Sequence, residues 1–235
     1  MSIAENVEHV RETIAAACAR AGRDPASVTL IAVSKTHPVD MVLAAAAAGV
    51  QHFGENRVEE AESKIPQVNA AATWHMIGHI QSRKAKDVPP LFNVVHSVDR
   101  FKLAEKLARA VVERGGRLDV LIEVNISGEE SKGGLPAFGW QTDPAVRAAV
   151  WDEIRQISAL PGLQVRGLMT MAPIVPTMAA ARPVFVGLRE LRDHLSVSLG
   201  VSLPDLSMGM TDDYPVAVEE GATMVRIGRA IFGER

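Results

Sequence analysis

The chain has 235 residues, of which 47% are hydrophobic and 23% charged, and its 25 Lys and Arg against 28 Asp and Glu give a formal net charge of −3 at pH 7. This near-neutral charge argues against a general nucleic-acid-binding protein, which would need a basic face to neutralise phosphates. No apolar run approaches the ~20 residues that span a bilayer. The acidic N-terminus does not have the pattern of a secretory signal, and a lone cysteine, Cys18, excludes an internal disulfide. We therefore expect a soluble, cytoplasmic, monomeric protein without a nucleic-acid or membrane partner.

The first half of the chain alternates predicted helices and strands. A helix is predicted over 2–21, where Ser2 followed three residues later by Glu5 has the pattern of a capping box. The apolar, β-branched run 28–35 predicts a strand buried on both faces. The other elements expected in this half are strands at 50–56, 74–79 and 94–98 and helices at 38–48, 57–71, 81–88 and 99–114.

The second half repeats this alternation. Pro183 is expected to divide the helical pattern 177–199 or to mark its true start. The segment 128–144 is the longest stretch without a regular pattern, so we expect an irregular loop there. The elements expected in this half are strands at 119–127, 165–171, 205–210 and 224–233 and helices at 144–159, 177–199 and 212–220.

The order of these elements predicts the fold class. Repeated units of a strand and then a helix, with continuously apolar strands, form parallel sheets covered by helices. Eight such units in about 250 residues is the size of a (β/α)8 TIM barrel. A doubly wound open sheet is the alternative, because the closure of a sheet cannot be read from a sequence. No linker divides the chain, so we expect one domain over 1–235, with an extra N-terminal helix at 1–21 and the barrel at 28–233.

Lys35 is unusual for the end of a buried strand. It shares the alternation of Ile31 and Val33, so its side chain should point where theirs do, and active groups of barrels lie at the carboxyl ends of strands. Desolvation depresses the pKa of a lysine and leaves some amine free to attack a carbonyl, which Schiff-base chemistry requires. The alternative is a lysine that merely reaches water, and the strand alone favours that alternative.

The last two units have the pattern of a phosphate site. SMGMTDD (207–213) and RIG (226–228) place glycines and small hydroxyl residues at strand ends, and barrels build phosphate sites from the loops after their seventh and eighth strands. Asp212 and Asp213 oppose a dianion there unless they cap the helix and face away. A reactive lysine on the first strand opposite such a loop fits pyridoxal phosphate, whose aldehyde and phosphate are bound at opposite ends.

Seven segments carry a resemblance to a known family. They are IAVSKTHP, HFGENRVEE, WHMIGHIQSRKAK, VHSVD, VNISGEESKGG, VRGLMTMAP and SMGMTDDYPVAVEEGATMVRIGRAIFG. They resemble the pyridoxal phosphate homeostasis proteins, single-domain relatives of the barrel half of alanine racemase. The resemblance runs from about residue 28 to the C-terminus and implies a fold-type III barrel that binds pyridoxal 5'-phosphate covalently through Lys35.

The same resemblance implies the other contacts of the cofactor. Ser207, Gly209, Gly228 and Arg229 would hold the phosphate, largely through backbone N–H groups. Asn56 and Met210 would line the pocket, and Arg226 would approach the pyridine ring. The family often has Thr where this chain has Arg229, Ser where it has Thr211, and Asn where it has Arg83. The first departure removes a hydroxyl and adds a guanidinium beside the expected phosphate, and Arg83 lies in a segment that in the family shapes the surface beside the pocket.

Whether the chain is an enzyme depends on a second proton-transferring group. Racemising an amino acid needs two opposed bases, and alanine racemases take one, a tyrosine, from a partner subunit's second domain. This chain is too short for a second domain, and its single tyrosine, Tyr214, follows the predicted phosphate loop. We therefore expect a non-catalytic protein of cofactor homeostasis, with apo forms of pyridoxal-phosphate enzymes as partners. A racemase-like enzyme and a cofactor-free Schiff-base aldolase are the alternatives.

Two further features have a structural and a functional interpretation. His75 and His79 have the spacing of a zinc pair on a helix, but on a strand four residues span roughly 13 Å, so we expect no shared metal. Glu123 interrupts the apolar run 119–127, where an unpaired carboxylate is costly, so it must pair inside the barrel or mark a wetter face.

Overall fold

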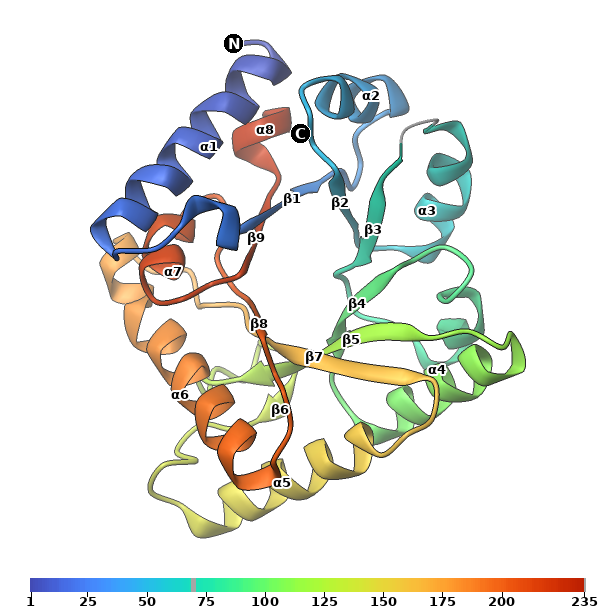
Figure 1. Ribbon diagram of the computed structural model, residues 1–235, viewed down its shortest axis with the longest axis vertical. Coiled ribbons are helices and arrows are strands. Elements are labelled where there is room, and N and C mark those ends of the chain that lie inside the picture. Colours follow the sequence, from blue (N-terminus) through green and yellow to red (C-terminus); the bar gives the residue numbers. More distant parts are fainter. Residues whose placement is uncertain (69–70, 235) are drawn as a thin grey trace.

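The computed structural model describes residues 1–68 and 71–234 as a barrel of parallel strands surrounded by helices (Figure 1). Within these residues the sheet runs in the order β4-β3-β2-β1-β9-β8-β7-β5, and a further pairing of β4 with β5 closes it. A ninth strand, β6, pairs only with β5 and lies outside the ring. The predicted (β/α)8 TIM barrel is therefore confirmed, and the open doubly wound sheet is excluded.

The barrel strands lie where the sequence predicts them, but all except β4 end earlier than predicted, and β3, β5 and β7 begin one or two residues earlier. They are β1 (Thr29–Val33), β2 (His52–Glu55), β3 (Thr73–Met76), β4 (Val94–Val98), β5 (Leu118–Asn125), β7 (Leu163–Met169), β8 (Asp205–Ser207) and β9 (Met224–Ile227), and β6 (Leu135–Pro136) lies in the segment expected to be irregular. The α-helices are α1 (Ile3–Arg20), α2 (Val39–Ala47), α3 (Val58–Lys64), α4 (Phe101–Glu113), α5 (Pro144–Ser158), α6 (Arg182–Leu199), α7 (Tyr214–Glu219) and α8 (Arg229–Phe232). Four 3₁₀ helices complete the described elements, η1 (Pro25–Ser27), η2 (Ile65–Gln67), η3 (Ser82–Asp87) and η4 (Met178–Ala181).

Helix starts follow the capping signals of the sequence. The Oγ of Ser2 accepts a hydrogen bond from the backbone N–H of Glu5 at 3.2 Å, and the Glu5 carboxylate accepts one from the N–H of Ser2 at 2.7 Å, which is a complete capping box. Pro183 lies in the first turn of α6, where its missing N–H costs nothing. Pro183 therefore marks the start of this helix, which is one of the two outcomes expected for it.

Three predicted elements differ from the structure. The strand expected over 224–233 ends at Ile227, because the backbone turns at Gly228 and α8 buries the remaining apolar side chains Ile231 and Phe232. A short apolar run fits a buried strand and a buried helix equally well, so periodicity could not separate them. The basic helix at 81–88 is the 3₁₀ helix η3. The helix expected over 57–71 ends as α3 and η2, and residues 69–70 lie outside the described part.

The helices cover the outside of the barrel, and α1 packs against α2, α7 and α8 beside the last barrel unit (Figure 1). The main apolar core lies between strands and helices and includes Phe53, Leu107, Phe185 and Ile227. Polar side chains such as His96 and Ser207 are buried inside the ring, where they contact each other across it. Among the described residues, no helix combines the length and the apolar character needed to cross a membrane.

Candidate functional site

The residues proposed from the sequence gather at or just below the carboxyl ends of the barrel strands. Lys35 lies two residues beyond β1, and Asn56 directly follows β2. Ser207 ends β8, and Gly209 and Met210 lie in the loop that follows. Arg226 lies in β9, and Gly228 and Arg229 begin α8. Because β1 and β9 are neighbours, as are β9 and β8, a lysine and two glycine-containing loops meet on one side of the barrel mouth.

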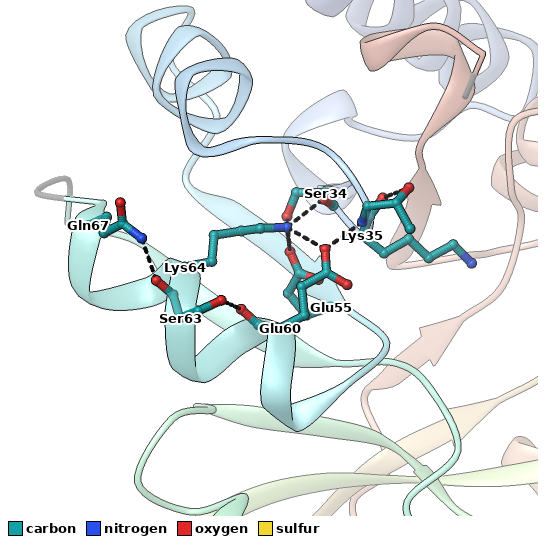
Figure 2. Close-up of polar contacts among 8 residues, drawn as sticks. Ser34, Lys35, Glu55, Glu60, Ser63, Lys64 and Gln67 are labelled. Atoms are coloured by element: carbon teal, nitrogen blue, oxygen red, sulfur yellow. Dashed lines mark hydrogen bonds and ion pairs between the residues drawn. The ribbon is translucent and has the colours of Figure 1, made fainter.

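The turn that carries Lys35 is strained. Thr36, the next residue, has a φ of 66° and is the only described non-glycine residue with a positive φ. A β-branched residue in this left-handed region costs roughly 1–2 kcal/mol, so other contacts must hold the turn. The Glu60 carboxylate supplies one, since its Oε1 accepts a hydrogen bond from the N–H of Thr36 at 2.5 Å. Lys35 itself is half-buried, and its side chain points away from Glu60 and toward the strands on the other side of β1 (Figure 2).

A buried ion pair holds the other side of the same turn. The Nζ of Lys64 donates hydrogen bonds to the carbonyl oxygen of Ser34 at 2.7 Å, to Oε1 of Glu55 at 2.7 Å and to Oε1 of Glu60 at 2.8 Å (Figure 2). The Lys64 side chain is 5% exposed and that of Glu55 is fully buried. The backbone before and after Lys35 is therefore fixed to α3 by one ammonium and one carboxylate.

Glu55 is the costly member of this cluster. Burial raises the pKa of its carboxyl above the usual value, and the hydrogen bonds from Lys64 and Ser34 offset only part of that effect. Its Oε2 is buried without a hydrogen-bond partner among the described residues. We did not single out Glu55, Glu60 or Lys64 from the sequence. The spacing of Glu60 and Lys64, four residues apart on a helix, was the available signal.

The loop after β8 needs glycine at position 209. Gly209 has a φ of 93°, and a Cβ there would lie 2.6 Å from the Cβ of Ala217 and 2.9 Å from the Cα of Tyr214. Asp213 closes the loop, since its Oδ1 accepts a hydrogen bond from the N–H of Met210 at 2.6 Å. Burial raises the pKa of the Asp213 carboxyl. Asp213 thus binds a backbone N–H of its own loop and makes no side-chain cap hydrogen bond to α7, so the capping that we expected to make room for an anion is not found.

Arg229 and Asp212 form an ion pair on the rim, with side chains 51% and 77% exposed. The guanidinium of Arg229 is thereby directed to a carboxylate of the neighbouring loop. Gly228, the residue before it, is the N-cap of α8, and a Cβ there would make only ordinary contacts with Val33. The structure therefore brings Arg229 next to the loop of Gly209 and places its charge opposite that of Asp212.

Arg226 lies beneath this loop, inside the barrel. Its Nη1 donates to the Oγ of Ser207 at 2.5 Å, and its Nη2 donates to the carbonyl oxygen of Thr170 at 2.9 Å. Burial lowers the pKa of Arg226 to about 10, and the carboxylates of Glu123 and Asp213 oppose that effect. Its charge is therefore a fixed feature of the barrel interior, bound to the same serine that was expected to hold a phosphate.

Glu123 points into the same interior. It is 5% exposed, and burial raises the pKa of its carboxyl to about 7, with Asp99 adding to the rise and Arg226 opposing it. A Cβ on Gly133 would lie 3.2 Å from Oε1 of Glu123, so the loop after β5 covers this carboxyl. Glu123 is thus a buried carboxyl inside the barrel that feels the charge of Arg226 without forming an ion pair or hydrogen bond with it among the described contacts, so the pairing expected as one outcome is not found.

The histidines do not form the pair that their spacing suggested. His75 is buried inside the barrel, where its Nδ1 lies 2.9 Å from Nε2 of His96. His79 is exposed at the mouth, with its Nδ1 3.3 Å from a carboxylate oxygen of Asp99. Within the described part of the chain, no group of three or more His, Cys, Asp or Glu side chains is arranged to hold a metal ion.

Asn56 has an unused hydrogen-bond acceptor. Its Oδ1 is buried and has no partner among the described residues. The close approach of Gly78, where a Cβ would lie 2.3 Å from the carbonyl oxygen of Asn56, fixes the backbone there. Asn56 also lines a cavity of about 510 Å³ together with the basic side chains Arg57, Arg83 and Lys84. Asn56 therefore offers an acceptor, beside three basic side chains, to a ligand that carries a hydrogen-bond donor.

Three comparisons with known proteins agree with this architecture. The chain matches the family described as "Alanine racemase, N-terminal domain" over residues 3–235. It is 39% identical to the pyridoxal phosphate homeostasis protein of Aquifex aeolicus, with 100% of this chain and 99% of that protein covered. It is 43% identical to the protein of the same name from Pseudomonas aeruginosa, with 100% and 96% covered.

Solved structures extend the comparison. PipY of Synechococcus elongatus, in a structure with PLP bound, superimposes with a TM-score of 0.82 at 39% identity, covering 99% of this chain and 100% of that one. An alanine racemase from Clostridium difficile shares the fold, with a TM-score of 0.70 at 13% identity and coverage of 89% of this chain but 53% of that enzyme. The chain belongs to the pyridoxal phosphate homeostasis protein family, whose barrel is that of the alanine racemase N-terminal domain.

Proposed function

We propose that this protein binds pyridoxal 5'-phosphate at the carboxyl end of its barrel and takes part in the intracellular homeostasis of that cofactor. The observation that carries the proposal is the meeting of Lys35, after β1, with the two glycine-containing loops after β8 and β9. The names of the relatives and the PLP bound to PipY support the same ligand.

The side chains and loops fit the two ends of this cofactor. Lys35 would hold the aldehyde end as a Schiff base, in which the C=N bond replaces the aldehyde C=O and water leaves. Ser207, Gly209, Met210, Gly228 and Arg229 would surround the phosphate. The unpartnered Oδ1 of Asn56 is an acceptor for a donor on the ring, and Arg226, which donates a hydrogen bond to Ser207, would approach the pyridine ring. When bound, the cofactor supplies an electron-poor ring that would stabilise negative charge on a carbon attached to the nitrogen bound by its aldehyde carbon.

The protein's own residues would keep the lysine in place and limit its chemistry. Glu60 and Lys64 fix the backbone on either side of Lys35, so its Nζ would meet the aldehyde from a defined direction. Tyr214, the one tyrosine of the chain, lies at the start of α7 and is 6% exposed. A Cβ added at Gly209 would clash with its backbone. Tyr214 is therefore buried against the loop of Gly209. This placement supports a carrier rather than a racemase.

A visible absorption spectrum tests the binding proposal. The purified protein incubated with pyridoxal 5'-phosphate should develop a visible band, and borohydride should fix the cofactor on the peptide that contains Lys35. Lys35→Ala should abolish both signals, whereas Lys86→Ala, at an exposed position of η3, should keep them. A protein that stays colourless with the cofactor would refute the proposal and favour the aldolase alternative.

Two further measurements test the finer parts of the function. Solvent deuterium should enter the Cα position of L- or D-amino acids mixed with the loaded protein no faster than with free cofactor, since the proposed function includes no catalytic base for that proton. Exchange above that of free cofactor would favour the racemase-like alternative. In the presence of a trap for free cofactor, the loaded protein should still activate an apo-enzyme. No transfer beyond release into solution would refute direct handover.

A further inference from the structure

A cavity at the carboxyl ends of β2 and β3 lies beside the candidate site. It has a volume of about 510 Å³ and is formed by the turn from β2 into α3 and by the segment that leads from the end of β3 into η3. Its lining shares one residue, Asn56, with the set proposed to hold the cofactor. We call this space the α3–η3 cavity.

The α3–η3 cavity carries an excess of positive charge. Three cationic side chains line it, those of Arg57, Arg83 and Lys84, against one carboxylate, that of Glu59. The Nζ of Lys84 lies 2.9 Å from Oε1 of Glu59, so these two charges offset each other. Arg57 and Arg83 have no ion-pair partner within residues 1–68 and 71–234. The Nε of Arg83 donates a hydrogen bond to the neutral Oε1 of Gln81 at 2.9 Å, which leaves the charge of its guanidinium uncompensated.

Arginines that line other cavities of the protein are bound to it. Arg11, in a cavity of about 570 Å³, donates hydrogen bonds to two carbonyl oxygens at the end of α2. Arg147, in a cavity of about 330 Å³, donates to two carbonyl oxygens of the loop before α5. Arg182 pairs with two carboxylates at the end of α7. The guanidiniums of these three arginines hold the fold together, whereas those of Arg57 and Arg83 have no such contacts among the described residues.

The α3–η3 cavity and the glycine-containing loops lie on opposite sides of β1. Strands β1 and β2 are parallel neighbours in which Val33 pairs with Gly54, so Lys35 and Asn56 each lie two residues beyond a paired position. The cavity therefore opens on the β2 side of Lys35. The loops after β8 and β9 lie on the other side, because the sheet order is β2-β1-β9-β8. A ligand in the cavity would not take the place of a phosphate at those loops.

Two uncompensated guanidiniums in one cavity suit a doubly charged anion. Arginine presents N–H donors in a planar fork that binds the oxygens of a phosphate or a carboxylate in pairs. A phosphate monoester carries about −1.5 to −2 charges at pH 7 and three acceptor oxygens, whereas a carboxylate carries one charge and would leave one guanidinium unmatched. The cavity volume of about 510 Å³ lies within the range of small-molecule sites, so there is room for an organic group attached to the phosphate.

We propose that the α3–η3 cavity is a second anion site, in which Arg57 and Arg83 bind the phosphate group of a phosphate monoester beside Lys35. This site uses neither the amine of Lys35 nor the loops after β8 and β9, so it is independent of the function proposed above. A second molecule of pyridoxal 5'-phosphate and a phosphate monoester without an aldehyde both offer the group that the two guanidiniums recognise.

Titration of inorganic phosphate into the cofactor-free protein tests the site. The ionic strength is kept low, because salt screens exposed charges. In nitrogen-15 NMR the guanidinium Nε–H signals of Arg57 and Arg83 should shift with one common dissociation constant, while the backbone signals of Gly209 and Gly228 report on the loops of the proposed function. Shifts at the two glycines alone would refute the second site and leave the proposed function intact. Shifts at the two arginines alone would support the second site and count against the proposed phosphate loops, and no shift at all would contradict both.

Single substitutions test whether the two arginines act together. Arg57→Gln and Arg83→Asn, the second of which introduces the residue that the family often has, should each weaken phosphate binding about tenfold, as expected for the loss of hydrogen bonds to a charged group. The Nε–H signal of the remaining arginine reports the affinity. Arg114→Gln removes the same charge from an exposed position at the end of α4 and should change the affinity less than twofold. Equal losses in all three variants would show an effect of net charge only and would contradict the site.

Three ligands added to Lys35→Ala identify the chemistry and the source of the anion. Pyridoxal 5'-phosphate and glycerol 3-phosphate should both shift the signals of Arg57 and Arg83, since the site binds the phosphate and not the aldehyde. Acetate should bind at least tenfold more weakly. A response to pyridoxal 5'-phosphate but not to glycerol 3-phosphate would assign the site to a second cofactor molecule. A response to acetate as strong as that to the phosphate monoesters, or no response to either monoester, would overturn the proposal.

Discussion

Replacement of Lys64 by methionine should destabilise the protein and loosen the turn that carries Lys35. Methionine keeps an unbranched stem of similar length at the end of α3 and removes the ammonium. Three hydrogen bonds disappear, to Ser34, Glu55 and Glu60, at 2.7, 2.7 and 2.8 Å. Breaking a buried pair costs about 3–5 kcal/mol, since the remaining charge is left uncompensated. We expect a loss in the lower half of that range, because Glu60 is partly exposed and can be solvated.

The pH dependence distinguishes this cause from lost packing. Burial already raises the pKa of Glu55, and removal of Lys64 removes the strongest interactions that lower it. A carboxyl with a raised pKa in the folded state contributes stability below its unfolded pKa and loses it as the pH rises. The deficit of Lys64→Met should therefore be larger at pH 8 than at pH 5, because protonation relieves the unpaired carboxylate.

Urea denaturation of the cofactor-free protein at the two pH values measures this deficit. The double variant Lys64→Met/Glu55→Gln removes the orphaned charge and should recover part of the stability at pH 8. A deficit under about 1 kcal/mol, or one that is the same at both pH values, would refute the electrostatic argument. So would a double variant that is no more stable than Lys64→Met alone.

Three other substitutions test the geometry of the mouth. The folded pKa of Glu123 is about 7 against an ordinary value of 4.5. Glu123→Gln should therefore gain about 2–3 kcal/mol of stability relative to the wild type as the pH rises from 5 to 8. A difference in unfolding free energy between the two proteins that stays the same across this pH range in denaturation experiments would contradict the burial of that charge. Gly209→Ala should lower the free energy of unfolding by more than about 2 kcal/mol, because the added Cβ meets a positive φ and clashes with Ala217. The control is Gly115→Ala, at a φ of 66° with no heavy atom within 4 Å of the added Cβ, which should cost only about 1 kcal/mol from the backbone conformation. Thr36→Gly should stabilise the apo form by about 1 kcal/mol in thermal unfolding, and a loss of stability would show that the left-handed turn is not strained.

The sequence predicted the barrel because its signals are local. Continuous apolar runs such as 28–35 fold into buried parallel strands, and capping residues such as Ser2 mark helix starts over a few residues. The predicted end of β9 was wrong for the same reason, because the apolar run that continues to Ile231 fits a strand and a helix equally well. Lys35 was recognised because a charged residue at the end of such a run contradicts the pattern.

The contacts around the candidate site were not predictable, because they join residues that are distant in the chain. His96 and Ser207 are separated by 111 residues and meet only when the barrel closes. Glu55 and Lys64 are nine residues apart and meet only because α3 folds back on β2. A sequence pattern shows that a buried carboxylate or imidazole must have a partner, but only the topology shows which partner it has.

Side chains alternate between the two faces of β1 and β2, which explains how one small region contains both the Lys64 ion pair and the residues that face the barrel interior and mouth. In β2 and the residue after it, His52 and Asn56 face the barrel interior and mouth, whereas Glu55 faces outward to Lys64. After β1, Ser34 is likewise bound from the outside and Lys35 points away from that cluster (Figure 2). Adjacent residues of a strand point to opposite faces, so the outer ion pair can fix the backbone without occupying the mouth. Loss of the ion pair should therefore disturb Lys35 through its backbone, while the contacts of His96 with His75 and Ser207 inside the barrel remain.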